Sequence, residues 1–276
     1  MNTNSSNSIP GGGTPDVQSL FAAAHADGDL SAAAFQVLAV PDLGAQIQAA
    51  MGVPTLDVPA TRAVLLTMLL DDSGSIAYKQ NEQAVRDGYN EVVRALQTTK
   101  QADDVLAQCS YLNRGVLYPY TFLAHAPRLD ARNFQASGGT PLYDQAIVTL
   151  GAVLAKAREF AAGGVPASTV TLIVTDGNDE SSQHSAKQVA TLVRDMLAQE
   201  SHIVAGLGID DGETDFRAVF RAMGIPDRWV LTPHADPHAI RQAFQFFSRS
   251  ALAATQNAGT FSQTAAAGFA VGGFGV

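Results

Sequence analysis

The strongest constraint on the fold is an apolar run at residues 63–70 (AVLLTMLL), which leads directly into the polar segment DDSGS at 71–75. A nearly continuous apolar run, interrupted here only by Thr67, is typical of a strand that is covered on both faces, as in the parallel sheet of an α/β protein. Beyond Ile76 the apolar residues recur at helical spacing, at positions 85, 89, 92, 93 and 96. The run therefore predicts a buried strand that turns into a helix, and ligands bind at that edge of open α/β sheets.

The rest of the chain alternates strand patterns with amphipathic helix patterns. Further strands are expected at 105–112, 115–124, 169–175, 203–207 and 229–231. The segment Asn113-Arg114-Gly115 is typical of a hairpin, so the two strands that flank it are expected to be antiparallel and to lie at the edge of the sheet. The alternation predicts right-handed crossovers and a Rossmann-like, doubly wound α/β sheet that is mostly parallel with one antiparallel edge strand.

The sequence divides into four parts. Residues 1–15 are mostly Asn, Ser, Gly and Pro without periodicity and are expected to be disordered. Residues 16–61 carry three short amphipathic patterns and are expected to form a helical extension, ahead of one α/β domain at 62–250. Residues 251–276 form a tail rich in Gly, Ala and Phe, and this tail has so little charge that we expect it to dock onto a partner or onto its own domain.

The charge of the chain limits its partners. Lys and Arg number 17 against 26 Asp and Glu, so the net charge is -9, and no basic patch for nucleic acid or for an anionic membrane is expected. No run of about eighteen apolar residues occurs, and the N-terminus has no basic or apolar export signal. We therefore expect a soluble, cytoplasmic protein, whose oligomeric state the composition leaves open.

Oxygen-bearing side chains follow the predicted buried strands. The residues concerned are Asp71, Ser73, Ser75, Thr140 and Asp176. The first three come at a spacing of two directly after the first strand, the fourth precedes a predicted helix, and the last ends the strand at 169–175. Carboxylate and hydroxyl oxygens are the ligands that magnesium, calcium and manganese prefer. The six histidines, by contrast, are scattered without the close pairing of a zinc site. The pattern predicts one hard divalent cation at the carboxyl edge of the sheet.

At these positions the chain resembles the von Willebrand factor A family. In that family a metal-ion-dependent adhesion site combines Asp-x-Ser-x-Ser after the first strand, a Thr in a later loop and an Asp at the end of the fourth strand. The segments SGGTPLYD at 137–144 and VTDG at 174–177 are similar to the family's sequence motifs around the Thr and the Asp. The match covers residues 62–249. The resemblance implies that Asp71, Ser73, Ser75, Thr140 and Asp176 surround one magnesium or manganese ion, some directly and others through water.

The resemblance also implies a function. The chain is similar to intracellular bacterial members of the family, including those linked to MoxR-type AAA ATPases and to tellurium-resistance or defence gene clusters. We therefore expect a non-enzymatic, protein-binding module in which an Asp or Glu side chain of a protein partner completes the coordination of the cation. A cation held by only two protein carboxylates remains electrophilic enough for this role.

Other interpretations of the same residues stay open. Ser73 and Ser75 are also favoured as helix caps, and the fold by itself does not show that the site holds metal. A magnesium-dependent phosphoryl-transfer enzyme with Asp71 as nucleophile would need a basic residue to hold the phosphate, and the nearest one is Lys79. A structural subunit would instead use the terminal segments for assembly.

The neighbouring acidic residues are expected to have simpler roles. Asp72 is expected to be solvated or to lie behind the ligands. Asp144, Asp179 and Glu180 are expected to be helix-start carboxylates. Residues 176–187 lack the Gly and the final Glu of an EF-hand loop, so a calcium loop of that kind is excluded there.

Overall fold

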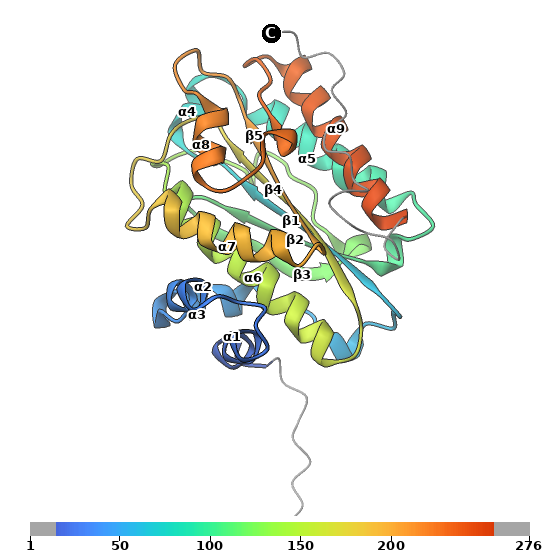
Figure 1. Ribbon diagram of the computed structural model, residues 1–276. Coiled ribbons are helices and arrows are strands. Elements are labelled where there is room, and N and C mark those ends of the chain that lie inside the picture. Colours follow the sequence, from blue (N-terminus) through green and yellow to red (C-terminus); the bar gives the residue numbers. More distant parts are fainter. Residues whose placement is uncertain (1–14, 257–276) are drawn as a thin grey trace, which may run out of the picture.

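The structure is a computed structural model that describes residues 15–256 (Figure 1). The predictions for residues 1–14 and for the tail beyond residue 256 lie outside the described residues. Helix α9 (Pro237–Gln256) includes the first residues of the predicted tail. Within the described part, no helix combines the length and the apolar character that crossing a membrane requires.

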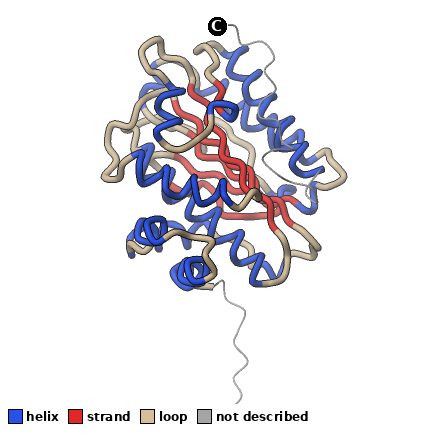
Figure 2. The backbone as a smooth tube through the Cα atoms, viewed as in Figure 1, coloured by secondary structure: helices blue, strands red, loops and turns tan. Residues whose placement is uncertain are grey.

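A six-stranded sheet forms the centre of the molecule, with strand order β3-β2-β1-β4-β5-β6 (Figures 1 and 2). The strands are β1 (Ala63–Leu70), β2 (Val105–Tyr111), β3 (Gly115–Phe122), β4 (Ala167–Thr175), β5 (His202–Gly208) and β6 (Val230–Leu231). Neighbouring strands are parallel except for β2 and β3, which are antiparallel and place β3 at the edge. The predicted doubly wound, mostly parallel α/β sheet with one antiparallel edge strand is confirmed. Every residue of β1 is buried, because helices cover both faces of the sheet.

Helices cover the two faces of this sheet (Figures 1 and 2). One face carries α5 (Glu82–Gln97), which packs along α9, and the predicted apolar stripe of α5 is buried. The other face carries α6 (Leu142–Ala162), α7 (Ala186–Ala198) and α8 (Phe216–Ala222). This division follows from right-handed crossovers, because the chain moves from β1 to β2 in one direction and from β4 to β6 in the other. The short elements are α4 (Gly74–Tyr78), η1 (Thr55–Asp57), η2 (Ala102–Asp104), η3 (Leu123–His125) and η4 (Asp227–Trp229).

The N-terminal residues add a further helical layer outside α6 and α7 (Figure 1). This N-terminal layer consists of α1 (Val17–Ala26), α2 (Ala32–Leu38) and α3 (Pro41–Ala50). The Asp16 and Ser31 side chains cap the first two helices, and Pro41 begins the third, where its missing amide hydrogen costs nothing. Gly151 of α6 permits the close approach of α3, because a Cβ at this position would lie 2.7 Å from Ile47 Cδ1.

A buried ion pair on α6 anchors the segment between the N-terminal layer and β1. Lys156 and Glu159 are both buried, and Lys156 Nζ lies 2.8 Å from Glu159 Oε2. Lys156 also donates to the Val53 carbonyl, and Glu159 Oε1 accepts a hydrogen bond from the Thr55 amide at 3.0 Å. Burial lowers the pKa of Lys156 below its usual range, although the charge of Glu159 opposes this shift. Each buried charge therefore depends on its partner.

Removing one member of this pair should destabilise the fold strongly. We expect Glu159→Ala to lower the free energy of unfolding by about 3–5 kcal/mol, because it leaves the Lys156 ammonium buried without its counter-charge. The double variant Lys156→Met/Glu159→Leu should lose less, since no unpaired charge remains. Urea unfolding followed by circular dichroism measures both losses. A Glu159→Ala loss below about 1 kcal/mol would contradict the anchoring role.

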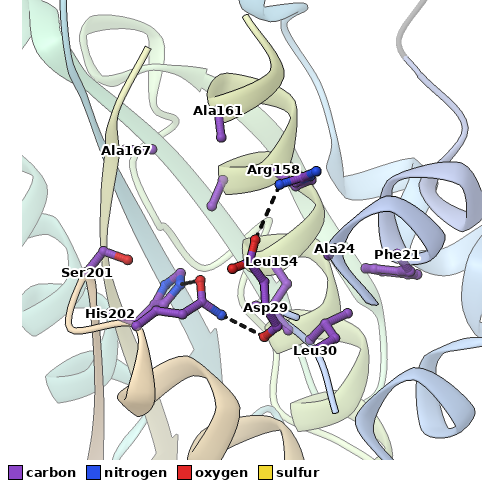
Figure 3. A pocket seen from close by; sticks show the side chains of 12 residues that line it. Phe21, Ala24, Asp29, Leu30, Leu154, Arg158, Ala161, Ala167, Ser201 and His202 are labelled. Carbon is purple, nitrogen blue, oxygen red and sulfur yellow. Dashed lines mark hydrogen bonds and ion pairs between the residues drawn. The ribbon is translucent and has the colours of Figure 1, made fainter. Parts of the chain in front are cut away.

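A cavity of about 110 Å³ lies between the N-terminal layer and the main domain (Figure 3). Polar contacts cross it: Arg158 Nη1 lies 3.3 Å from Asp29 Oδ2, and Gln199 donates to the Asp29 carbonyl at 3.0 Å. His202, at the start of β5, continues this chain, with Nε2 lying 3.3 Å from Gln199 Oε1. His202 is buried, and its burial lowers the pKa of the imidazole to about 4.

His202 should make the fold sensitive to acid. Its pKa is about 4 in the folded protein and about 6.5 in an unfolded chain, so the unfolded state binds the proton first as the pH falls. The stability that His202 contributes is present above about pH 6.5 and is lost as the pH falls towards 4. We expect the free energy of unfolding to fall more steeply between about pH 7 and about pH 4.5 in the native chain than in His202→Asn. Chemical unfolding at a series of pH values measures the two slopes, and equal slopes would contradict this role.

Candidate metal centre

Pairing between β1 and β4 brings two polar segments together at the carboxyl edge of the sheet. The parallel register places Leu70 opposite Val174, so the residues that follow the two strands are neighbours as well. These are residues 71–75 after β1 and 175–177 after β4. The chain continues from β1 to β2 on one side and from β4 to β5 on the other, so the strand order reverses at this pair. Open α/β sheets hold their ligands at such a reversal.

Asp71 is completely buried at this edge, and both of its carboxylate oxygens accept hydrogen bonds. Oδ1 accepts from the Ser73 amide at 2.7 Å. Oδ2 accepts from the Thr175 hydroxyl at 2.8 Å and from the Asp176 amide at 3.3 Å. Burial raises the pKa of Asp71 to about 6, the charge of Asp176 adds to the shift, and the hydrogen bonds oppose it. The carboxylate is therefore fixed in orientation but lacks a compensating positive charge.

Two hydroxyls and a second carboxylate form a row beside Asp71. Ser73 Oγ lies 2.9 Å from Ser75 Oγ, which donates to Asp176 Oδ1 at 2.5 Å. Asp176 is 1% exposed, and its Oδ2 atom accepts no hydrogen bond from the described residues. Burial raises the pKa of Asp176 above its usual range. The row thus ends in a buried carboxylate oxygen that accepts no hydrogen bond from the described residues and that a cation would stabilise.

Thr140 reaches the same place from the loop ahead of α6. Backbone hydrogen bonds hold this loop: the Gly74 amide donates to the Gly138 carbonyl at 3.0 Å, and the Glu180 amide donates to the Thr140 carbonyl at 3.0 Å. Gly138 has a φ of +104°, which residues with side chains rarely adopt, and a Cβ there would collide with the Asn113 side chain. Thr140 itself is buried.

The structure brings the five predicted residues together. Four of them, Ser73, Ser75, Thr140 and Asp176, line one solvent-facing cavity of about 300 Å³. Asp71 does not line this cavity but lies directly behind it, hydrogen-bonded to the Ser73 and Asp176 amides. That these five residues bind a metal ion stays a prediction.

The donor set fits a hard divalent cation. Two buried carboxylates and three hydroxyls supply oxygen atoms only, as magnesium and manganese prefer. A divalent ion would also supply the positive charge that Asp71 lacks and would give the Oδ2 atom of Asp176 a direct ligand contact. Among the described residues no group of three His, Cys, Asp or Glu side chains is placed to hold a metal.

Asp72 has a role that the sequence did not predict. It is completely buried, so the expectation of a solvated side chain is wrong, whereas the alternative position behind the ligands agrees with the structure. Its Oδ1 atom accepts hydrogen bonds from the Asn113 amide at 2.8 Å and from Asn113 Nδ2 at 3.0 Å, and its carbonyl accepts from the Ser137 amide at 2.6 Å. Burial raises the pKa of Asp72. The residue joins the β2–β3 turn and the Thr140 loop to the end of β1.

Of the other neighbouring acids, Asp144 agrees with the expectation, whereas Asp179 and Glu180 differ from it. Asp144 lies in the first turn of α6 as predicted, but its Oδ1 atom accepts from the His184 amide at 2.9 Å and lies 2.6 Å from the His184 ring. Asp179 caps α6 rather than its own following helix, because its Oδ1 atom accepts from the Tyr143 amide at 3.1 Å. Glu180 begins no helix and lines the cavity, so its predicted role is wrong.

Comparison with solved structures shows a known fold. The open form of the pilus adhesin SpaC from Lactobacillus rhamnosus GG has a TM-score of 0.51 and 14% identity, over 69% of this chain and 30% of that chain. A von Willebrand factor type A protein from Catenulispora acidiphila has a TM-score of 0.43 and 17% identity, over 69% of this chain and 43% of that chain. Manganese-loaded TRAP protein from Plasmodium vivax has a TM-score of 0.41 and 16% identity, over 67% of this chain and 74% of that chain.

These likenesses concern the fold alone. The chain spans less than half the length of the first two proteins. No family model matches the sequence, and no curated protein sequence matches it significantly.

The variant Asp176→Asn should show two separate effects on stability: that of the buried Asp176 charge in the absence of metal, and that of metal binding. In chelator we expect Asp176→Asn to melt no lower than the native chain, because the variant removes a charge beside Asp71 and keeps the bond from Ser75. Millimolar magnesium or manganese should raise the melting temperature of the native chain by several degrees and leave that of Asp176→Asn unchanged. Differential scanning calorimetry measures both. An unshifted native melting temperature would count against a metal centre here.

Proposed function

We propose that this chain, which has the fold of a von Willebrand factor A domain, is a non-enzymatic module that binds a protein partner through a magnesium or manganese ion. In this proposal Ser73, Ser75, Thr140 and Asp176 hold the ion in the cavity, and Asp71 supports them from behind. An Asp or Glu side chain of the partner then reaches the ion from the solvent side of the cavity.

One observation carries the proposal. Asp176 Oδ2 is a buried carboxylate oxygen that accepts no hydrogen bond from the described residues, and Asp176 lines a cavity that faces solvent. An ionised oxygen in such a position is unfavourable unless a cation accompanies it. The Ser75 hydroxyl touches the other oxygen of the same carboxylate, so a cation at Oδ2 has hydroxyl oxygens close by.

The interpretation of the serines as helix caps receives no support. Ser73 is the N-cap residue of α4, yet its side chain makes no capping hydrogen bond to that helix. Its hydroxyl contacts the Ser75 hydroxyl instead, and Ser75 donates to Asp176. Both side chains are therefore directed into the oxygen cluster.

The arrangement also favours binding over phosphoryl transfer. Asp71 would be the nucleophile, but both of its oxygens accept hydrogen bonds within the protein, and it does not line the cavity. Lys79 is the single basic residue among those that line this cavity, beside the acidic residues Glu180, Asp211 and Glu213.

The finer part of the proposal is that the chain works in the bacterial cytoplasm, in a complex linked to an AAA ATPase or to a stress or defence system. It rests on the resemblance of the motifs to intracellular bacterial members of the family. The net charge of -9 supports a protein partner rather than nucleic acid or a membrane surface. The alternative of a structural subunit relies on the N-terminal helices, which are described, and on the Gly/Ala/Phe tail, most of which lies outside the described residues.

Thr140→Ala tests the function most selectively. The substitution removes one hydroxyl from the cavity without adding or removing charge, and we expect it to weaken magnesium-dependent association with the partner by roughly a hundredfold. Chelator should reproduce the loss in the native chain. Thr98→Ala, which removes an exposed hydroxyl at the end of α5, is the matched control and should bind as the native chain does.

The measurement is quantitative cross-linking of the tagged chain in its native host, in magnesium and in chelator, with circular dichroism to confirm folding. If folded Thr140→Ala and the native chain hold the same partner equally well in chelator, binding is independent of metal and the proposal is wrong.

A further inference from the structure

A lysine ammonium already stands beside the proposed metal site. Lys79 Nζ lies 3.6 Å from Asp176 Oδ2 and donates a hydrogen bond to the Asp176 carbonyl at 3.3 Å. The Lys79 side chain is 27% exposed, whereas that of Asp176 is completely buried. The positive charge therefore faces the carboxylate oxygen that accepts no hydrogen bond.

The short helix α4 determines the position of this lysine. Ser75 and Lys79 are four residues apart, a spacing that puts two side chains on the same face of a helix. Ser75 donates a hydrogen bond to Asp176 Oδ1, and Lys79 faces Asp176 Oδ2. One face of the helix therefore contacts both carboxylate oxygens of Asp176. Buried Ile76 fixes the helix in the core, and Gln80, with a φ of 59°, ends it directly after the lysine. In the sequence Lys79 stands out only as the basic residue nearest to Asp71, and its spacing of four from Ser75 is the signal that could have placed it beside Asp176.

A second carboxylate, that of Asp211, interacts electrostatically with the same Lys79 ammonium. Asp211, in the loop after β5, lines the cavity together with Lys79. Burial would raise the pKa of Asp211, but hydrogen bonds from its own loop and the charge of Lys79 lower it below the usual range. Asp211 is also more exposed than Asp176. The Asp211 carboxylate can therefore serve as the counter-charge of the Lys79 ammonium when a divalent cation binds Asp176.

We infer that Lys79 is a built-in competitor of the divalent cation: its ammonium neutralises Asp176 in the metal-free protein and leaves Oδ2 when the ion binds. The inference rests on the proposed metal site. An ammonium and a divalent ion on one carboxylate oxygen repel each other strongly in a partly buried cavity, so binding of the ion includes the work of moving Lys79. The lysine thereby keeps the metal affinity below that of the oxygen ligands alone. The module becomes competent for its partner only where the divalent ion is abundant.

Lys79→Gln and Arg114→Gln form a matched pair for the test. Both remove one positive charge from the same edge of the sheet, but Arg114 Nε lies 3.9 Å from Asp72 Oδ2, whereas only Lys79 faces Asp176. Isothermal titration with manganese chloride should show a Kd about fivefold to tenfold lower in Lys79→Gln than in the native chain. Arg114→Gln should stay within about twofold of the native value, because its charge is more exposed and screened. Lys79→Arg, which keeps the charge, should bind like the native chain.

Thermal unfolding supplies an independent readout. In chelator Lys79→Gln should melt below the native chain, because Asp176 has lost its counter-charge, and saturating manganese should close that gap. Equal manganese affinities for the native chain and Lys79→Gln would overturn the inference and leave the metal-binding function standing. Failure of both chains to bind manganese would overturn the metal site and the inference together. Binding by Lys79→Gln alone would support the inference and show that the lysine excludes the ion from the native chain.

Discussion

Parallel pairing of β1 with β4 places two buried carboxylates side by side. The register that sets Leu70 opposite Val174 leaves Asp71 and Asp176 adjacent at the reversal of strand order. Burial raises the pKa of both carboxyl groups, and the charge of Asp176 adds to the shift of Asp71, so the pair is unfavourable without positive charge. Hydrogen bonds satisfy Asp71, but one oxygen of Asp176 still requires a cation. Either the Lys79 ammonium or a divalent ion can supply that positive charge. In the inferred mechanism the ion replaces the ammonium at Asp176, and this exchange makes binding depend on metal.

The remaining walls of the cavity are loops that hydrogen bonds tie to one another. Asp72 joins Asn113 in the β2–β3 turn to the end of β1, and Asp179 from the loop after β4 caps α6. Thr140 is therefore positioned relative to Asp176 by contacts among several segments rather than by one rigid element. Networks of buried polar groups behave as a unit, so disturbing one member changes the geometry of the others.

The N-terminal layer lies on the helices rather than at the carboxyl edge of the sheet (Figure 1). Buried polar contacts hold the segment that leads from this layer into β1. The Lys156 and Glu159 pair holds residues 53–55 against α6, and β1 begins at Ala63 and ends at Leu70, directly before Asp71. Asp71 itself is held by hydrogen bonds from Ser73, Thr175 and Asp176 at the other end of the strand.

The sequence by itself determined the sheet and the membership of the oxygen cluster. Strand 63–70 is apolar on both faces, the apolar period changes after Ile76, and residues 113–115 form a turn, so these elements follow from local patterns. The five oxygen-bearing residues stand at strand ends and before a helix, and parallel strands necessarily gather such positions at one edge.

Only the tertiary structure decided what surrounds that cluster. The burial of Asp72 against Asn113, the capping of α6 by Asp179 and the approach of Lys79 to Asp176 join residues that are 41, 36 and 97 positions apart. Local propensity carries no information about such partners. They are chosen when loops from different strands pack together and each buried polar group finds a donor, an acceptor or a counter-charge within reach.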